Sequence, residues 1–424
     1  MLRHYLELPR AIYIICLGTF LNRAGSFILL FLTPYLREQL HFETSEATRT
    51  MSAYGAGSIL AALVGGHLAD KIGRKTVMAG SLIGGSIILL ILAHLRSPWA
   101  ITLMVLTFAL VMDTYRPAAS AMIADLVDVD RRQHAFSLVY ISINLGFCVA
   151  PLVGGALAKR SYVWLFVGDS VTTAVYAIII IVFLAESLGR GEKKAQAEGG
   201  AAAKIEYSPG GDEFISAGRA VAHILADRRF MLFVLASLFV AIVYQQGITT
   251  FPLYLHSLGI DEQGYGQIVA VNGIMIVCVQ VPLTAFVARF RRGPGLVVGA
   301  LFIAVGFGMK AWATAPWQFM LTVAVWTVGE MMDAPLKFAV ATDLAPERLR
   351  ARYMGVMTMT FSLGLMIGAT VGGEVLERYG GPTLWVSCLV VAVLAAVIYA
   401  LQAEGLDKPR TPAAAARTGA EIHA

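Results

Sequence analysis

The chain has 424 residues, of which 57% are hydrophobic and only 14% are charged, and its formal net charge is +5. Soluble domains carry about 25% charged residues, so this composition excludes an ordinary water-soluble domain. Its apolar runs are about 20 residues long, which is enough to cross a hydrocarbon core of about 30 Å as helices and too long for barrel strands. We therefore predict an all-α integral membrane protein.

Charged residues and Pro- or Gly-containing breaks divide the chain into twelve predicted spans. The spans cover residues 11–36, 48–68, 76–95, 99–124, 135–158, 162–184, 230–256, 264–288, 295–314, 317–342, 353–376 and 382–402. We expect two six-helix bundles, 1–184 and 230–405, joined by a cytoplasmic linker at 185–229 that is rich in Gly, Ala, Lys and Glu. Apolar residues at helical spacing within 212–228 indicate an amphipathic helix on the membrane surface, and the tail 406–424 is predicted to be disordered.

Basic residues are distributed unequally between the two sides of the membrane. The sparser side would carry only Arg37, Arg49, Arg96, Lys159, Arg160, Lys310 and Arg378. The positive-inside rule therefore predicts a multi-pass protein of the cell (inner) membrane with both termini in the cytoplasm. The four cysteines lie in apolar segments without CxxC spacing, so we interpret them as packing residues and not as metal ligands or disulfides.

One offset of 218 residues aligns the two predicted bundles without a gap. It places Pro34 on Pro252, Gly55 on Gly273, Pro98-Trp99 on Pro316-Trp317, Pro117 on Pro335, Asp125-Leu126 on Asp343-Leu344, Gly146 on Gly364 and Gly154-Gly155 on Gly372-Gly373. Shared apolar composition would not bring Pro, Trp, Asp and paired Gly into one register. Two six-helix repeats around a midplane site are a transporter architecture.

The loop between the second and third spans reads Gly65-Gly66-His67-Leu68-Ala69-Asp70-Lys71-Ile72-Gly73-Arg74-Lys75. It resembles the signature loop of the major facilitator superfamily, in which Gly is followed four residues later by Asp and then by basic-x-Gly-Arg-Lys. The resemblance implies the two-bundle fold of that family and a cytoplasmic latch that stabilises the outward-facing state. The residues of this latch would be Gly66, Asp70, Gly73, Arg74 and Asp125.

The fifth span carries Gly146, then Ala150-Pro151, then Gly154-Gly155. It resembles the helix-packing motif of twelve-helix drug:proton antiporters, with Ala150 in place of one Gly. Small residues let helices approach closely and Pro151 bends the helix, although ordinary transmembrane packing also favours glycine. The Arg that this family usually carries early in span four has no match in this chain, because Leu103–Ala109 is apolar and Arg116 lies further along the helix.

Several ionisable residues fall inside the predicted spans, where each costs at least about 2.5–3.5 kcal/mol to insert. They are Arg23, Asp113, Arg116, Asp169, Glu330, Asp333 and Lys337. The 218 offset places Glu330 on Met112, next to Asp113, so both halves carry an acid at nearly the same depth.

A proton-coupled carrier needs buried carboxylates that can exchange a proton. We predict proton-coupling roles for Asp113, Glu330 and Asp333, with Arg116 and Arg23 as partners. The alternative is a static ion pair that fixes helix packing, and Asp169, nearer the outer surface, fits either interpretation.

Neutral polar and aromatic residues in the spans are candidates for the substrate cavity. They are Asn22, Tyr115, Tyr140, Asn144, Tyr244, Gln245, Gln246, Asn272 and Trp326. Aromatic faces and a few amides suit amphipathic and cationic compounds, but each aromatic alone is also compatible with lipid-facing packing.

These features predict a secondary active transporter that couples proton flow to the efflux of small amphipathic compounds by alternating access. The alternatives are proton-coupled uptake of a sugar, amino acid or organic acid, coupling to sodium in place of protons, a membrane sensor, or a membrane enzyme. The sequence has no HExxH motif and no P-loop, so we expect no enzymatic activity, no ATP hydrolysis, no cofactor and no metal. The expected partners are a small-molecule substrate, protons and the lipid bilayer, with no nucleic acid, and we expect a monomer.

Overall fold

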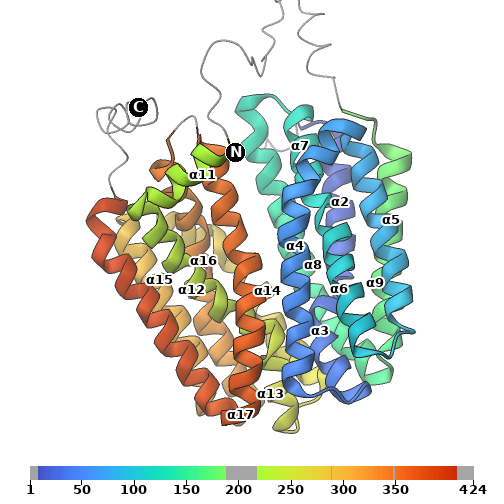
Figure 1. Ribbon diagram of the computed structural model, residues 1–424, viewed down its shortest axis with the longest axis vertical. Helices are drawn as coiled ribbons and strands as arrows, with labels where there is room; N and C mark the ends of the chain where they lie inside the picture. Colours follow the sequence, from blue (N-terminus) through green and yellow to red (C-terminus); the bar gives the residue numbers. More distant parts are fainter. Residues whose placement is uncertain (1–7, 188–216, 288, 347–348, 408–424) are drawn as a thin grey trace, which may run out of the picture. The chain divides into compact units, whose positions relative to one another are not determined.

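The computed structural model describes residues 8–187, 217–287, 289–346 and 349–407. All the secondary-structure elements assigned among these residues are helices (Figure 1). Most of the predicted linker and nearly all of the predicted disordered tail lie outside the described residues. The prediction of an all-α fold is therefore confirmed for the described residues.

The helices group into two compact units. Among the described residues, the first unit takes in 8–187 and also Gly259–Gly273. Its helices are α2 (Arg10–Ala24), α3 (Phe27–Pro34), a π-helical turn η1 (Tyr35–Gln39), α4 (Thr44–Ile72), α5 (Arg74–Leu92), α6 (Pro98–Asp113), α7 (Tyr115–Leu126), α8 (Val129–Arg160) and α9 (Val163–Phe183).

The second unit takes in Phe214–Leu258 and the residues from Ile274 onwards. Its elements are α11 (Ala217–Ala226), α12 (Arg228–Thr249), α13 (Phe251–Ser257), the part of α14 (Glu262–Val287) that follows Gly273, α15 (Arg292–Gly308), a 3-10 turn η2 (Met309–Ala311), α16 (Pro316–Leu344) and α17 (Arg350–Leu406). Helix α17 is interrupted at Gly380, whose φ of 80° is a conformation that glycine adopts without steric cost.

Nine helices or helix pairs in the described part of the chain are long and apolar enough to cross a membrane. Helices α4 and α16 are not among the nine, and α17 counts once although it is broken at Gly380. Helix α16 carries Glu330, Asp333 and Lys337, which lower its apolar character. The order of helices accommodates the twelve predicted spans, with α2–α3, α6–α7 and α12–α13 each forming one broken span.

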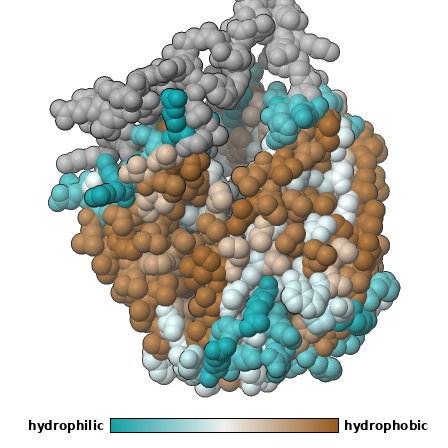
Figure 2. All heavy atoms as spheres, in the orientation of Figure 1, coloured by the Kyte–Doolittle hydropathy of each residue, from teal (hydrophilic) through white to brown (hydrophobic). Residues whose placement is uncertain are grey.

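The outer faces of the helices are apolar, as a lipid environment requires. Leu103, Val182, Val281 and Leu401 are each more than 60% exposed, and brown apolar residues cover large parts of the face seen in Figure 2. Inside the first unit, a core cluster joins α2, α5, α7 and α9. Here Gly18 faces the ring of Tyr176, so close that a Cβ on Gly18 would lie 1.9 Å from it.

Candidate functional site

Asp113 lies at the centre of a polar cluster in the first unit. It is the last residue of α6, where span four breaks before α7, and its side chain is buried. The Ser58 hydroxyl donates to Asp113 Oδ2 over 2.5 Å, and Arg116 Nε lies 3.1 Å from Oδ1. Both carboxylate oxygens therefore have a partner, and the charge is balanced by a guanidinium whose side chain is 55% exposed.

Arg23 approaches this cluster from the last turn of α2. Its guanidinium carbon lies 5.9 Å from the centroid of the Phe147 ring, and it interacts electrostatically with Asp113 and Arg116. A Cβ on Gly146 of α8 would lie 2.4 Å from Arg23 Cβ. The absence of a side chain at Gly146 therefore lets the Arg23 backbone approach α8 closely.

Glu330 and Asp333 of α16, in the second unit, have different partners. The Tyr244 hydroxyl of α12 donates to Glu330 Oε1 over 2.9 Å. Lys337 Nζ lies 2.5 Å from Asp333 Oδ2, with both side chains less than 5% exposed. Lys337 therefore offsets the like-charge repulsion between Glu330 and Asp333. The i, i+4 spacing of Asp333 and Lys337 could have revealed this ion pair from the sequence.

Several predicted substrate residues are engaged within the protein. In the first unit, Asn22 Nδ2 donates to Thr173 Oγ1 over 3.0 Å, and Asn144 Nδ2 donates to the Tyr140 carbonyl of its own helix over 2.8 Å. The hydroxyl oxygens of Tyr115 and Tyr176 lie 2.5 Å apart. Hydrogen bonding of this kind fits helix packing as well as it fits a binding site.

In the second unit, two adjacent glutamines join α12 to α17. Gln245 Nε2 donates to the Phe361 carbonyl over 3.1 Å, and Gln246 Nε2 donates to the Gly368 carbonyl over 2.8 Å. Gln246 Oε1 also accepts from the Thr250 hydroxyl over 2.8 Å. The amide N–H groups of this pair therefore make contacts between helices, whereas Gln246 Oε1 is bonded at the end of its own helix.

The other three predicted substrate residues differ in their exposure. Tyr140 is 47% exposed and Asn272 is half-buried. Trp326 is buried, its indole N–H has no hydrogen-bond partner among the described residues, and its ring stacks edge-on against Tyr244 at 5.5 Å between centroids. Trp326 and Tyr244 therefore place an aromatic pair next to Glu330.

Arg74, the first residue of α5, connects α4 to α7. Its Nη2 lies 3.0 Å from Asp70 Oδ1, its Nε lies 3.1 Å from Asp125 Oδ2, and its Nη1 donates to the Ala69 carbonyl over 3.2 Å. The Asp70 side chain is 69% exposed, whereas Asp125 is 29% exposed and Arg74 only 14%. Because solvent weakens exposed ion pairs, Asp125 is the stronger partner.

Glu186 and Ser187, at the start of the predicted linker, extend this cluster. Glu186 accepts hydrogen bonds from the backbone N–H groups of Arg74 and Lys75 over 2.9 and 3.0 Å, at the N-terminus of α5. The Ser187 hydroxyl donates to Asp125 Oδ2 over 2.9 Å. The sequence alone does not indicate either residue, because both belong to a segment whose composition predicts a solvated linker.

The glycines of the signature loop have different surroundings. A Cβ on Gly65 would lie 2.6 Å from the Pro117 ring, whereas the space around Gly66 is open. Gly73 has φ of 101° and separates α4 from α5. The close helix approach therefore belongs to Gly65 and not to Gly66, the residue that the family resemblance implies for the latch.

The glycines of α8 face two different neighbours. A Cβ on Gly154 would lie 2.6 Å from the Phe31 ring of α3, and a Cβ on Gly155 would lie 2.6 Å from the Glu262 carbonyl oxygen. The carbonyl of Pro151 would similarly meet a Cβ on Gly266 at 2.1 Å. The predicted packing motif thus lies where α8 approaches α3 and the first residues of α14.

Polar contacts reinforce this packing where α8 ends and α9 begins. Lys159 Nζ lies 3.1 Å from Asp261 Oδ2, and the Tyr162 hydroxyl donates to Glu262 Oε1 over 2.5 Å. Burial, followed by this hydrogen bond, raises the pKa of the Tyr162 phenol, so the hydroxyl keeps its proton and remains a donor.

A counterpart of the Arg74 cluster exists in the second unit. Arg292, the first residue of α15, forms an ion pair with Asp343 near the end of α16. The backbone N–H of Gly293 donates to Asp407 Oδ1 over 2.9 Å. The 218 offset could have predicted this pair, because it places Arg74 on Arg292 and Asp125 on Asp343.

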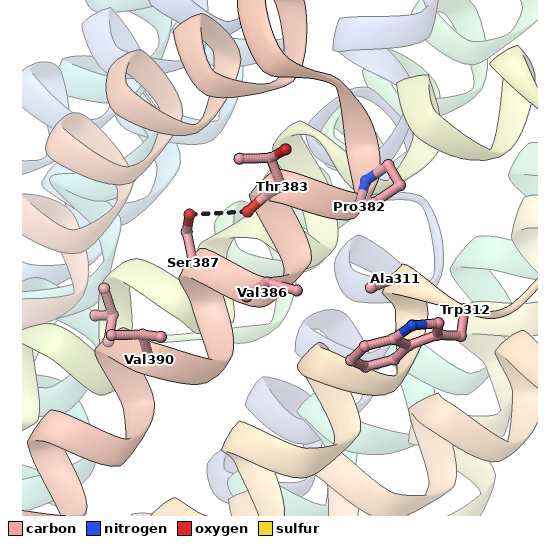
Figure 3. Close-up of a pocket in the computed structure, with 8 residues that line it drawn as sticks. Ala311, Trp312, Pro382, Thr383, Val386, Ser387 and Val390 are labelled. Atoms are coloured by element: carbon pink, nitrogen blue, oxygen red, sulfur yellow. Dashed lines mark hydrogen bonds between the residues drawn. The ribbon is translucent and has the colours of Figure 1, made fainter.

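A cavity of about 510 Å³ lies elsewhere in the second unit, beside Trp312 and the start of the last span (Figure 3). Pro382, Val386 and Val390 contribute to its largely apolar wall, and the Ser387 hydroxyl donates to the Thr383 carbonyl of its own helix over 2.8 Å. None of the predicted site residues lines this cavity. Among the described residues, no cluster of His, Cys, Asp and Glu could hold a metal ion.

The family model described as the Major Facilitator Superfamily matches residues 15–332 and 248–422 of the chain. The chain belongs to the Major Facilitator Superfamily. This membership confirms the family predicted from the signature loop, and it makes the protein a transporter and not an enzyme.

Several relatives are similar in sequence to this superfamily member over most of its length. It is 28% identical over 393 residues to an uncharacterized MFS-type transporter, YttB, of Bacillus subtilis (strain 168), a match that covers 91% of this chain and 94% of YttB. It is 25% identical to a Na(+), Li(+), K(+)/H(+) antiporter of Planococcus maritimus, with 82% and 85% of the two chains covered. It is also 25% identical to the multidrug resistance protein MdtH of Aeromonas hydrophila subsp. hydrophila, with 78% and 79% covered.

The fold of the transporter is also similar to that of solved structures. A crystal structure of a POT family transporter in complex with 5-aminolevulinic acid superposes with a TM-score of 0.75, covering 94% of this chain and 97% of that chain. The sequence identity is 17%, so the similarity establishes the fold alone.

Proposed function

We propose that this transporter couples the export of small amphipathic organic compounds to inward proton movement by alternating access. The observation that carries the proposal is a buried or half-buried carboxylate in each unit, Asp113 beside Arg116 and Glu330 beside Tyr244. The 218 offset places the two acids at adjacent positions of the repeat. Carboxylates in such surroundings can exchange a proton when a conformational change alters their partners. Arg23 supports this role as a third charge near Asp113.

Within the second unit we assign proton exchange to Glu330 in preference to Asp333. Glu330 accepts from a neutral phenol, whereas Asp333 lies 2.5 Å from the Lys337 ammonium. An ammonium stabilises the charged carboxylate more strongly than a neutral donor does. Asp333 and Lys337 then serve as a buried ion pair that supports the site.

The substrate class is inferred from the surroundings of Glu330. Trp326 and Tyr244 stack edge-on, and Phe361 lies 6.3 Å from Tyr244 between ring centroids. Aromatic faces beside a carboxylate suit amphipathic compounds, including cations. Relatives named as a cation/proton antiporter and as a multidrug resistance protein support export in exchange for protons.

The excess of Lys and Arg on one side supports cytoplasmic termini in the inner membrane, and we propose that the transporter works as a monomer. The Arg74–Asp125 pair, with Gly73 at the turn, is proposed to be the latch that stabilises the outward-facing state.

Growth of a sensitised host on a panel of toxic amphipathic compounds tests the direction of transport. Increased resistance in cells that carry the transporter is the expected result. Increased sensitivity, or rescue of an auxotroph by a nutrient, would instead establish uptake. The same screen supplies the compound for the coupling experiment.

Glu330→Gln tests the coupling in proteoliposomes with an imposed pH gradient. Gln keeps an acceptor for Tyr244 but cannot exchange a proton, so we expect transport driven by the gradient to fall by about tenfold or more while binding of the compound survives. Glu377→Gln, the same change at an exposed position of α17, should transport normally. Unchanged coupling in Glu330→Gln would rule out the assignment.

A further inference from the structure

Asp169 of α9 is a buried carboxylate that has no part in the function proposed above. Its side chain is 5% exposed, and no Lys or Arg nitrogen of the described residues lies within 4.0 Å of it. Asp113 and Asp333, in contrast, each have a basic partner. An ionised carboxylate buried without a basic partner is costly, so its presence in a membrane span indicates a functional role.

Asp169 accepts a hydrogen bond at the point where the first span is broken. Helix α2 ends at Ala24 and α3 begins at Phe27. In an uninterrupted helix, the N–H of Ile28 would donate to the carbonyl of Ala24. Here it donates to Asp169 Oδ2 over 3.2 Å, so the carboxylate satisfies a donor at the start of α3.

Asp169 is also connected to the other side of the break. The Thr173 hydroxyl donates to Asp169 Oδ1 over 3.4 Å, and it accepts from Asn22 Nδ2 of α2 over 3.0 Å. A Cβ on Gly25, inside the break, would lie 1.9 Å from Thr172 Oγ1. One carboxylate therefore holds α3 directly and α2 through Thr173, with the break packed tightly against α9.

The break also connects Asp169 to the polar cluster around Asp113. Arg23 lies in the last turn of α2, directly before the break, and acts electrostatically on both Asp169 and Asp113. A change in the angle between α2 and α3 would therefore move Arg23 relative to Asp113. This relationship would link the protonation of Asp169 to the charges proposed to carry protons.

Few charged or titratable groups face Asp169. Arg23 of α2 and Tyr54 of α4 act on it electrostatically. Helix α3 has no charged residue, and α5 and α8 carry theirs only near their ends. The contact of α9 with α5 next to Asp169 is a hydroxyl pair, with Ser86 Oγ 2.8 Å from Ser170 Oγ.

The internal repeat indicates that the fold does not need an acid here. The 218 offset places Asp169 on Ser387, whose hydroxyl donates to the Thr383 carbonyl of its own helix. The second unit therefore builds the equivalent span without a buried carboxylate.

We propose that Asp169 is a second proton-binding group of the first unit and that its protonation releases the break in the first span. One proton from solvent binds one carboxylate oxygen, and no other covalent bond changes. The neutral acid is a weaker acceptor for the Ile28 amide, so α2 and α3 become free to change their angle and carry Arg23 with them. The inference rests on the proposed proton coupling, because it supplies a step by which a proton moves a helix.

Infrared difference spectroscopy of the purified full-length transporter tests the protonation without needing a substrate. Acidification should produce the carbonyl stretch of a protonated carboxyl group, and Asp169→Asn should lose that part of the signal. Asp128→Asn, the same change at an exposed position, should retain it. A signal of equal size in Asp169→Asn would overturn the proposal.

Amide hydrogen exchange at Phe27 and Ile28 tests the release of the break. After correction for the intrinsic rate, exchange in the wild type should be about tenfold faster in acidic than in mildly alkaline buffer. Asn still offers an uncharged acceptor to Ile28, so the corrected rate in Asp169→Asn should be high and independent of pH. A rate in the wild type that does not change with pH would show that Asp169 is a structural cap only.

Failure of this inference can be distinguished from failure of the proposed function. If transport by the wild type in proteoliposomes did not respond to a pH gradient, the proposed proton coupling would be wrong, whatever the role of Asp169. Coupled transport in the wild type that persists unchanged in Asp169→Asn would remove Asp169 from the coupling and leave the proposed function intact.

Discussion

Arg292 forms an ion pair with Asp343, and both residues lie 218 positions after Arg74 and Asp125, which form the corresponding pair in the first unit. In each unit the arginine is the first residue of a helix, and the aspartate lies within two residues of the end of another. A backbone N–H at the start of each of these helices also donates to a carboxylate, that of Glu186 in the first unit and that of Asp407 in the second. The repeat is therefore preserved at the level of contacts and not only of sequence.

Substitutions of the two arginines should differ in their effect on stability. Arg74→Ala removes two ion pairs and a hydrogen bond from a mostly buried guanidinium, so we expect the free energy of unfolding to fall by about 1–3 kcal/mol. Arg292→Ala removes one pair whose side chains are 45% and 34% exposed, and should cost about 0–1 kcal/mol. Thermal unfolding in detergent measures both effects.

Asp70→Asn is the matched control for the first unit, because the Asp70 side chain is 69% exposed. We expect it to change the free energy of unfolding by less than about 0.5 kcal/mol. If Asp70→Asn cost as much as Arg74→Ala, the conclusion that Asp125 is the stronger partner would be wrong.

The positions of the spans could be predicted closely from the sequence. The sixth predicted span, 162–184, is observed as α9 over Val163–Phe183, and the second, 48–68, lies within α4. Span length is set locally by the thickness of the hydrocarbon core, so apolar composition is enough to locate it. The breaks of the first and seventh spans could not be found in this way, since apolar stretches continue on both sides of Gly25 and Thr250 and span length does not show where a helix inside one span ends.

Inside the spans, the partners of the charged residues could be predicted only where the two residues are three or four positions apart in the sequence. The i, i+3 spacing indicates Arg116 for Asp113, and the i, i+4 spacing indicates Lys337 for Asp333. In contrast, Asp113 accepts a hydrogen bond from Ser58, which is 55 positions away, and Asp169 accepts one from Ile28, which is 141 positions away. Such contacts depend on how helices are placed, which periodicity does not reveal.

Neighbouring glycines of the signature loop should respond oppositely to alanine. A Cβ at position 65 would lie 2.6 Å from the Pro117 ring and 3.2 Å from the Thr114 carbonyl oxygen. Gly65→Ala should therefore force α4 away from span four and lower the free energy of unfolding by about 1–3 kcal/mol.

Gly66→Ala is the control, because a Cβ there meets no atom within 4 Å. Alanine stabilises a helix interior relative to glycine, so we expect the free energy of unfolding to be unchanged or to rise by up to about 1 kcal/mol. Thermal unfolding of the two variants side by side gives the comparison. Equal destabilisation by both would contradict the close approach at Gly65.

Lys310 is enclosed by aromatic rings, although its position in the sequence predicts a charge on the outer surface. Its side chain is fully buried, and its Nζ lies 3.7, 4.0 and 4.8 Å from the ring centroids of Phe251, Phe307 and Trp385. The ammonium has no hydrogen-bond partner among the described residues. The faces of the three rings therefore provide its main stabilisation.

The internal repeat places Lys310 on Leu92, which is also buried. A leucine therefore fits the equivalent position of the first unit, and Lys310→Leu should leave the free energy of unfolding unchanged or raise it, because a buried charge is removed. Phe251→Leu in the wild type should lower it through the loss of ring packing and of the cation–π contact. In the Lys310→Leu background the cation–π part is already absent.

A double-mutant cycle over Lys310→Leu and Phe251→Leu isolates this contact. We expect Phe251→Leu to cost about 0.5–2 kcal/mol less in the Lys310→Leu background than in the wild type, which is the range for cation–π contacts from exposed to desolvated sites. Denaturant or thermal unfolding in detergent measures the four variants. Additive effects would show that the rings pack against Lys310 without stabilising its charge, and a large loss of stability in Lys310→Leu alone would show that the ammonium has a partner other than these rings.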